Sequence, residues 1–111
     1  MTKSQTLAAF DVSCLVAVIA CGANAYGIPI HEEVKNLVSP LRSIALSAVY
    51  RTLDRLEQKG LVSSWYGDAT PERGGRAKRY FRVTTAGRES LQKALKPMRR
   101  ALEVVEGSSI R

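Results

Sequence analysis

The chain has 111 residues, 45% of them hydrophobic, and its 17 lysines and arginines against 10 aspartates and glutamates give a net charge of +7. This length and composition suit one folded domain and exclude a chain with two independent cores. The surplus charge is concentrated between residues 73 and 100, where ten basic residues face one acid, so this segment carries +9 and the remainder −2. A surplus this localised predicts a polyanionic partner, either a nucleic acid or an anionic membrane surface.

The first third of the chain predicts a helix followed by a loop. From Leu7 to Cys21 the apolar residues recur on several sides of a helical pattern, which predicts burial on more than one face and indicates a partner subunit. Cys14 and Cys21 would lie roughly 10 Å apart along that helix, beyond disulfide reach. We expect them to be small buried hydrophobes of a reducing cytoplasm. The segment CGANAYG then forms a loop.

A secretory signal is the alternative interpretation of this region. The apolar run from Cys14 to Ala23 leads into an Ala-Asn-Ala segment at 23–25 that resembles a small-residue cleavage site. Two features disfavour a signal peptide. Asp11 places an acid just before the apolar run, and Lys3 is the only basic residue in the N-terminal segment. The run is also ten residues long, well short of the roughly 20 that span a bilayer.

A second, shorter helix is predicted to open near Pro29 and to run to residue 38, because proline is tolerated in a first turn. His31, Glu32 and Glu33 are expected to face solvent. Pro40 prevents this helix from continuing into the next one. The apolar stripe of the second helix is formed by Ile30, Val34, Leu37 and Val38.

Residues 46–59 predict a helix with two unlike faces. Leu46, Val49, Leu53 and Leu56 form an apolar stripe at spacings of 3, 4 and 3. A cationic face with small residues suits a DNA major groove, because arginine matches the two acceptors of guanine. An ordinary amphipathic surface helix is the alternative, but the preceding helix and break give the helix-turn-helix order. The face opposite the stripe carries Ser47, Ala48, Arg51, Thr52 and Arg55.

A β-hairpin is predicted after this helix. Gly60 is placed to end the helix in a left-handed conformation, and residues 61–66 and 77–83 read as strands. The glycine-rich loop between them carries Arg73 and Arg76, whose reach and charge suit phosphates or a narrow minor groove. A flexible hairpin with incidental charge is the alternative. Trp65 is expected to pack under this hairpin, with the lining of a ligand pocket in a dimer as its alternative role.

The last predicted helix begins after Thr84 as its N-cap. Its apolar residues recur at spacings of 4, 3, 4 and 3, the pattern of a coiled-coil seam, which predicts packing against a second copy of the chain. A helix folded back onto its own domain is the alternative. Pro97 is expected to kink the helix around residues 93–97, and residues 107–111 form a tail. The seam consists of Leu91, Leu95, Met98, Leu102 and Val105.

Four segments together resemble the PadR family of winged-helix transcriptional regulators: AYGIPI at 25–30, AVYRTLDRLEQKGLV at 48–62, TPERGGRAKRYFRVT at 70–84 and TAGRESL at 85–91. The resemblance implies a mainly α fold with a small β-hairpin (α+β). It implies a winged helix-turn-helix DNA-binding domain at 1–83, a dimerisation helix at 84–106 and a tail at 107–111. It further implies a cytoplasmic bacterial repressor that dimerises through the C-terminal helix packed with the partner's first helix.

Carried over by position, the resemblance assigns the recognition surface to Ser47, Ala48, Arg51, Thr52 and Arg55. It implies that Tyr26 contacts a phosphate and that Tyr50 is packed. The wing residues Arg73, Arg76, Lys78 and Arg79 would touch the DNA backbone or minor groove. The chain departs from the family where Ala45 replaces a serine cap, leaving Ser43 as the candidate cap, and where Pro97 interrupts the dimer helix.

Enzyme chemistry finds no support in the sequence. His31 is the sole histidine and is read as a solvated surface residue, and no Cys/His set has the spacing of metal ligands. We therefore expect no catalytic residues, no metal and no cofactor. No segment has the character of a membrane-binding amphipathic helix.

The sequence therefore predicts a homodimeric repressor that binds a palindromic operator in double-stranded DNA, with helix 46–59 in the major groove and wing 67–77 on the backbone or minor groove. The alternative is a winged-helix module for protein assembly or RNA contact. The resemblance suggests phenolic or drug-like effectors for some family members, but no residue here identifies one.

Overall fold

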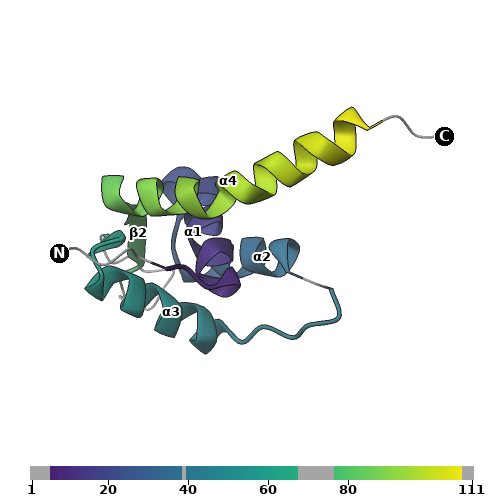
Figure 1. The fold of residues 1–111 in the computed structure, drawn as a ribbon. Coiled ribbons are helices and arrows are strands. Elements are labelled where there is room, and N and C mark those ends of the chain that lie inside the picture. Colours follow the sequence, from purple (N-terminus) through teal and green to yellow (C-terminus); the bar gives the residue numbers. More distant parts are fainter. Residues whose placement is uncertain (1–5, 39, 68–76, 109–111) are drawn as a thin grey trace.

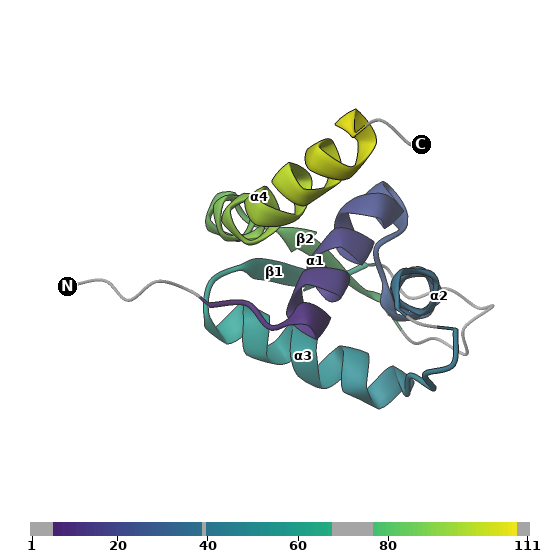
Figure 2. The same ribbon diagram turned by 45° about the vertical axis from the view of Figure 1, so that its right-hand side comes forward.

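The computed structural model describes residues 6–38, 40–67 and 77–108. In chain order the elements are α1 (Ala9–Cys21), a short 3-10 turn η1 (Gly22–Asn24), α2 (Gly27–Leu37), α3 (Leu46–Gln58), β1 (Val62–Tyr66), β2 (Arg79–Val83) and α4 (Thr85–Gly107). In both views α1 lies between α3 on one side and the first turns of α4 on the other (Figures 1 and 2). The predicted fold class, mainly helical with one small antiparallel hairpin, is confirmed.

The core forms where the apolar stripes of the first three helices meet. α1 contributes residues from more than one face, as its pattern predicted, including Leu15 and Ala17. α2 contributes Ile30 and Val34, but its predicted stripe is too long, because Leu37 ends the helix and is 46% exposed. From α3 the buried apolar residues are Val49, Leu53 and Leu56.

The two ends of α3 differ in how their backbone groups are satisfied. Its N-cap is Ala45, which supplies no side-chain hydrogen bond, so the prediction that Ser43 caps the helix is wrong. At the other end Gly60 adopts φ +78°, as predicted. Its N–H donates to the Glu57 carbonyl and that of Leu61 donates to Leu56, both at 2.9 Å, which closes the helix in a Schellman motif.

The hairpin completes the core that the helices form. Its register pairs Val62 with Val83 at one end and Tyr66 with Arg79 at the other. Phe81 and Val83 are buried, and the Phe81 N–H donates to the Ala25 carbonyl at 2.8 Å, which joins β2 to the segment before α2. The tip of the predicted wing, with Arg73 and Arg76, lies outside the described residues.

α4 divides into a packed half and a projecting half. The Thr84 hydroxyl accepts from the Gly87 N–H at 3.0 Å, which confirms the predicted N-cap, and donates to the Gly60 carbonyl at 2.7 Å. Leu91 is buried in the core, so the fold-back alternative describes this first half. The helix continues through Pro97, and its second half changes direction and leaves the domain (Figure 1). No described helix is both long and apolar enough to cross a membrane.

One buried ion pair joins α1 to α3. The carboxylate of Asp11 is bound by the Arg55 guanidinium, and it also accepts from the Ala8 N–H at 3.1 Å, which caps the first turn of α1. Asp11 is 3% exposed, whereas 47% of the Arg55 side chain is accessible. Because a buried carboxylate needs partners, Arg55 is first of all the counterion of Asp11.

We predict that Gly87→Ala destabilises the fold by roughly 1–3 kcal/mol, the usual range for overpacking. An added Cβ would overlap the Leu61 carbonyl oxygen and lie 2.7 Å from Val83 Cγ1. Gly107→Ala in the same helix is the control, because nothing described lies within 4 Å of its added Cβ. Urea titration of both variants measures the difference, and equal midpoints would contradict the close approach.

We predict that Arg55→Ala lowers the free energy of unfolding by roughly 1–3 kcal/mol, because it leaves the buried Asp11 carboxylate with one described donor. Arg51→Ala, on the exposed face of the same helix, should stay within about 0.5 kcal/mol of the wild type. The double variant with Asp11→Ala should recover part of the loss. Denaturant unfolding checks this, and equal losses for Arg51→Ala and Arg55→Ala would refute it.

Candidate nucleic-acid interface

The outward face of α3 presents the cationic surface that the sequence predicted, but with fewer members. Ser47 and Arg51 are exposed and Ala48 is partly exposed. Among the described residues Arg51 has no ion pair or hydrogen-bond partner, so its guanidinium is available to a ligand. The first turn of α3 contains no acid that would repel an anion.

Thr52 does not belong to this surface. It is 5% exposed, so its predicted place on the outward face is wrong. Position 52 follows Val49 by three residues and precedes Leu56 by four, so the three side chains share one side of the helix. The buried face of α3 is therefore wider than four apolar residues suggest.

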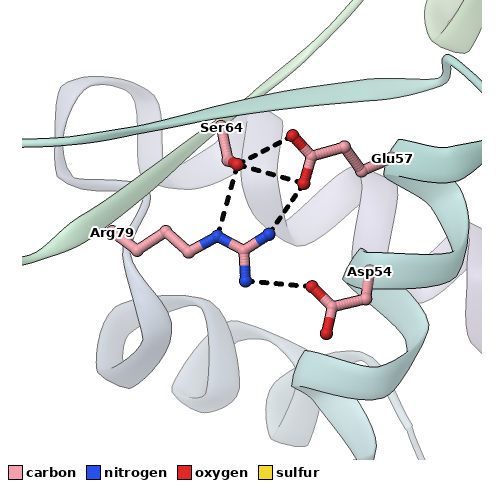
Figure 3. Close-up of polar contacts among 4 residues, drawn as sticks. All are labelled: Asp54, Glu57, Ser64 and Arg79. Atoms are coloured by element: carbon pink, nitrogen blue, oxygen red, sulfur yellow. Dashed lines mark hydrogen bonds and ion pairs between the residues drawn. The ribbon is translucent and has the colours of Figure 1, made fainter.

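Arg79 is bound by carboxylates of α3 (Figure 3). Its Nη1 lies 2.9 Å from Asp54 Oδ1, and its Nη2 donates to Glu57 Oε1 at 2.7 Å. Ser64 of β1 completes the cluster, because its Oγ accepts from Arg79 Nε at 3.2 Å and donates to Glu57.

This cluster gives Arg79 a structural role. Burial disfavours the charged guanidinium, but the hydrogen bonds and charges of Asp54 and Glu57 outweigh it and raise the pKa of Arg79. Its side chain is 24% exposed. The expectation that Arg79 contacts DNA is therefore revised, because its donors hold the loop end of the hairpin against α3.

Lys78 and Tyr26 meet at the end of the hairpin where the wing loop joins the strands. Lys78 Nζ lies 4.3 Å from the centre of the Tyr26 ring, and Tyr26 forms a β-bridge with Tyr80. Tyr26 is also the N-cap residue of α2. The two predicted backbone contacts are thus adjacent in space, and a cation over the ring is stabilised there.

Tyr50 is packed, as expected. Its ring lies 6.4 Å from that of Phe81, and its hydroxyl occupies the space that a side chain at Gly27 would need. The expectation that His31 faces solvent is wrong. The side chain is half-buried, and its Nε2 donates to the Ile44 carbonyl at 2.7 Å. The histidine joins α2 to the segment that leads into α3, a role that its exposed acidic neighbours concealed.

Trp65 lies on the surface of the hairpin and is 44% exposed, so its expected packing under the wing is wrong. Its ring stacks on Tyr80 at 5.9 Å with an interplanar angle of 19°, and the Arg82 guanidinium lies 5.4 Å from its centre. It lines a pocket of about 480 Å³ together with Val18, Ile19 and Arg88.

Both cysteines are free thiols. Cys14 is buried, as predicted, and burial, reinforced by Asp11, raises its pKa to about 12 against the opposing charge of Arg55. Cys21 is half-buried, and burial together with Glu33 also raises its pKa. Both side chains therefore remain protonated and weakly nucleophilic at neutral pH. The described residues contain no group of three or more His, Cys, Asp or Glu placed to hold a metal ion.

Comparison with known proteins agrees with this geometry. Residues 15–93 match the transcriptional regulator PadR-like family. An uncharacterised protein of Lysinibacillus sphaericus is 30% identical over 81 residues, which cover 73% of this chain and 72% of that protein.

Two solved structures share the fold. A transcriptional regulator from Clostridium thermocellum is 22% identical, with a TM-score of 0.63, over 90% of this chain and 92% of that one. A PadR family transcription regulator from Clostridium difficile is 20% identical, with a TM-score of 0.65, over 90% of this chain and 97% of that one. With the family match covering most of its length, the chain belongs to the PadR-like family of winged helix-turn-helix, DNA-binding transcriptional regulators.

Proposed function

We propose that this regulator is a homodimeric repressor of a palindromic operator in double-stranded DNA. In this proposal α3 enters the major groove, and residues 67–77 contact the backbone or minor groove. The observation that carries the proposal is the outward face of α3, where Arg51 is exposed beside the small side chains of Ser47 and Ala48. The regulator would act in the cytoplasm by binding alone, without catalysis.

Arg51 is the residue best placed to read a base. Its planar guanidinium matches the N7 and O6 acceptors of guanine, and small neighbours allow the helix to approach the base edges. Ser47 precedes it by one helical turn and so lies on the same line of the surface. Lys78 and Tyr26, at the loop end of the hairpin, would contact the backbone that flanks the groove.

The projecting half of α4 supports the dimer. Met98, Leu102 and Val105 are 68%, 55% and 65% exposed, and they line an apolar groove with Leu95. Burial of this stripe against a second copy would remove large apolar side chains from water. In this proposal the first half of α4, with Leu91 in the core, belongs to the DNA-binding domain, and the projecting half, which extends to Gly107, is the dimerisation element. Two-fold symmetry then requires half-sites about 34 Å apart, one helical turn of DNA.

We expect Arg51→Ala to relax sequence preference, because a lost base contact costs about 1–3 kcal/mol on the preferred site and little on unrelated DNA. Arg76→Ala, a substitution in the predicted wing, should instead weaken binding to all sequences alike. Fluorescence anisotropy on a fragment selected from random DNA, with unrelated DNA and RNA as competitors, measures both. Identical effects of the two variants would contradict the assignment, and preferential competition by RNA would favour a role in RNA contact.

We expect Leu102→Glu to raise the dissociation constant of the dimer at least about tenfold, because it places an unpaired charge within the apolar contact. Gln92→Glu adds the same charge at an exposed position outside the stripe and should leave the dimer intact. Sedimentation equilibrium measures both variants, with circular dichroism to verify folding. A wild-type chain that sediments as a monomer at all concentrations would remove the dimer from the proposal.

A further inference from the structure

A groove of about 340 Å³ runs along the start of α3, on the side that faces the N-terminal end of α1. Its walls include Phe10 of α1, Arg42 of the segment before α3, and both Arg51 and Arg55 of α3. Since a water molecule occupies about 30 Å³ in the liquid, the groove has room for a phosphate group with its hydrating water.

The charge of this groove is unbalanced. Three guanidinium groups line it and no acid does. The carboxylate that offsets them is that of Asp11, which is buried and bound by Arg55. Like charges that converge on one concave surface repel each other unless an anion lies between them. The groove therefore suits an anionic ligand.

Arg42 is the residue in this groove that sequence reasoning did not single out. It is exposed, and its guanidinium carbon lies 5.5 Å from the centre of the Phe10 ring, which supports one face of the planar group. Among the described residues Arg42 has no ion pair, so its N–H donors are available.

Arg55 contributes to the groove in a fixed orientation. Asp11 engages its Nη2, but a guanidinium carries five N–H donors, so others remain. Nearly half of the Arg55 side chain, 47%, is accessible to solvent. The buried carboxylate thus fixes the guanidinium without covering it.

We propose that this groove binds one backbone phosphate of DNA, with Arg42 and Arg55 as the donors. The inference rests on the proposed function, because α3 must lie in the major groove for a phosphate to arrive there. It separates the arginines of α3 by role: Arg51 reads a base, whereas Arg55 positions the duplex without reading sequence.

The first test measures binding of the full chain to a selected DNA fragment over a range of salt concentrations. Arg42→Ala should raise Kd about tenfold for preferred and unrelated DNA alike, and the slope of log K against log salt should become less negative by about 1 per subunit. Arg42→Lys retains the charge and should retain the wild-type slope. Arg88→Ala, which removes an exposed arginine on α4, should leave Kd within about twofold of wild type and the salt slope unchanged.

The second test neutralises one phosphate at a time with methylphosphonate. At one position in each half-site, neutralising the phosphate should weaken DNA binding by the wild type. The same substitution should not weaken binding by Arg42→Ala any further. Arg55→Lys keeps a cation for Asp11 but loses the planar fork, so it should show the same loss of response at that position.

The outcomes separate the inference from the proposed function. Two results would show that the groove is not a phosphate site, provided that the wild type binds DNA. In the first, Arg42→Ala leaves Kd and the salt slope as unchanged as Arg88→Ala does. In the second, each methylphosphonate weakens binding by Arg42→Ala as much as it weakens binding by the wild type. Base reading by Arg51 would then be unaffected. A wild type that binds no DNA fragment would instead overturn the proposed function itself.

Discussion

The geometry of this regulator depends on ion pairs that hold α3 from two sides. On one side the buried Asp11 of α1 binds Arg55. On the other, Arg79 at the loop end of the hairpin binds Asp54 and Glu57. A helix that must present side chains to a partner needs a fixed rotation about its axis, and hydrophobic contacts alone define that rotation loosely because they are non-directional. Charged hydrogen bonds on both flanks supply the direction that the apolar stripe lacks.

This arrangement changes the meaning of the charge in the chain. The positive surplus pointed to a polyanion, and the family identity agrees with that. However, the basic residues are not equivalent, because Arg79 and Arg55 neutralise acids within the fold. Arg51 and Arg42 have no such partner among the described residues, so they are the groups that an external anion would meet at the lowest desolvation cost.

The two halves of α4 illustrate how one periodic pattern serves two environments. Thr84 and Gly87 hold the first turn against the hairpin, and Leu91 completes the core. Beyond Pro97 the same pattern continues on a surface with nothing of its own domain to cover. A heptad pattern reports that a helix face is apolar, but it does not distinguish contact within the chain from contact with a second copy.

The sequence alone determined the order of helices and strands, the end of α3 at Gly60, the cap at Thr84 and the family, because these depend on local spacing and on residues with strong backbone preferences. Only the tertiary structure decided the partners of Asp11 and Arg79, the burial of Thr52 and the hydrogen bond of His31. The bonded groups in the two ion-paired clusters lie 44 and 22 residues apart, and no periodicity connects positions that distant. Which arginines remain free for DNA follows from how the elements pack, because Asp11, Asp54 and Glu57 bind the cations that folding brings to them.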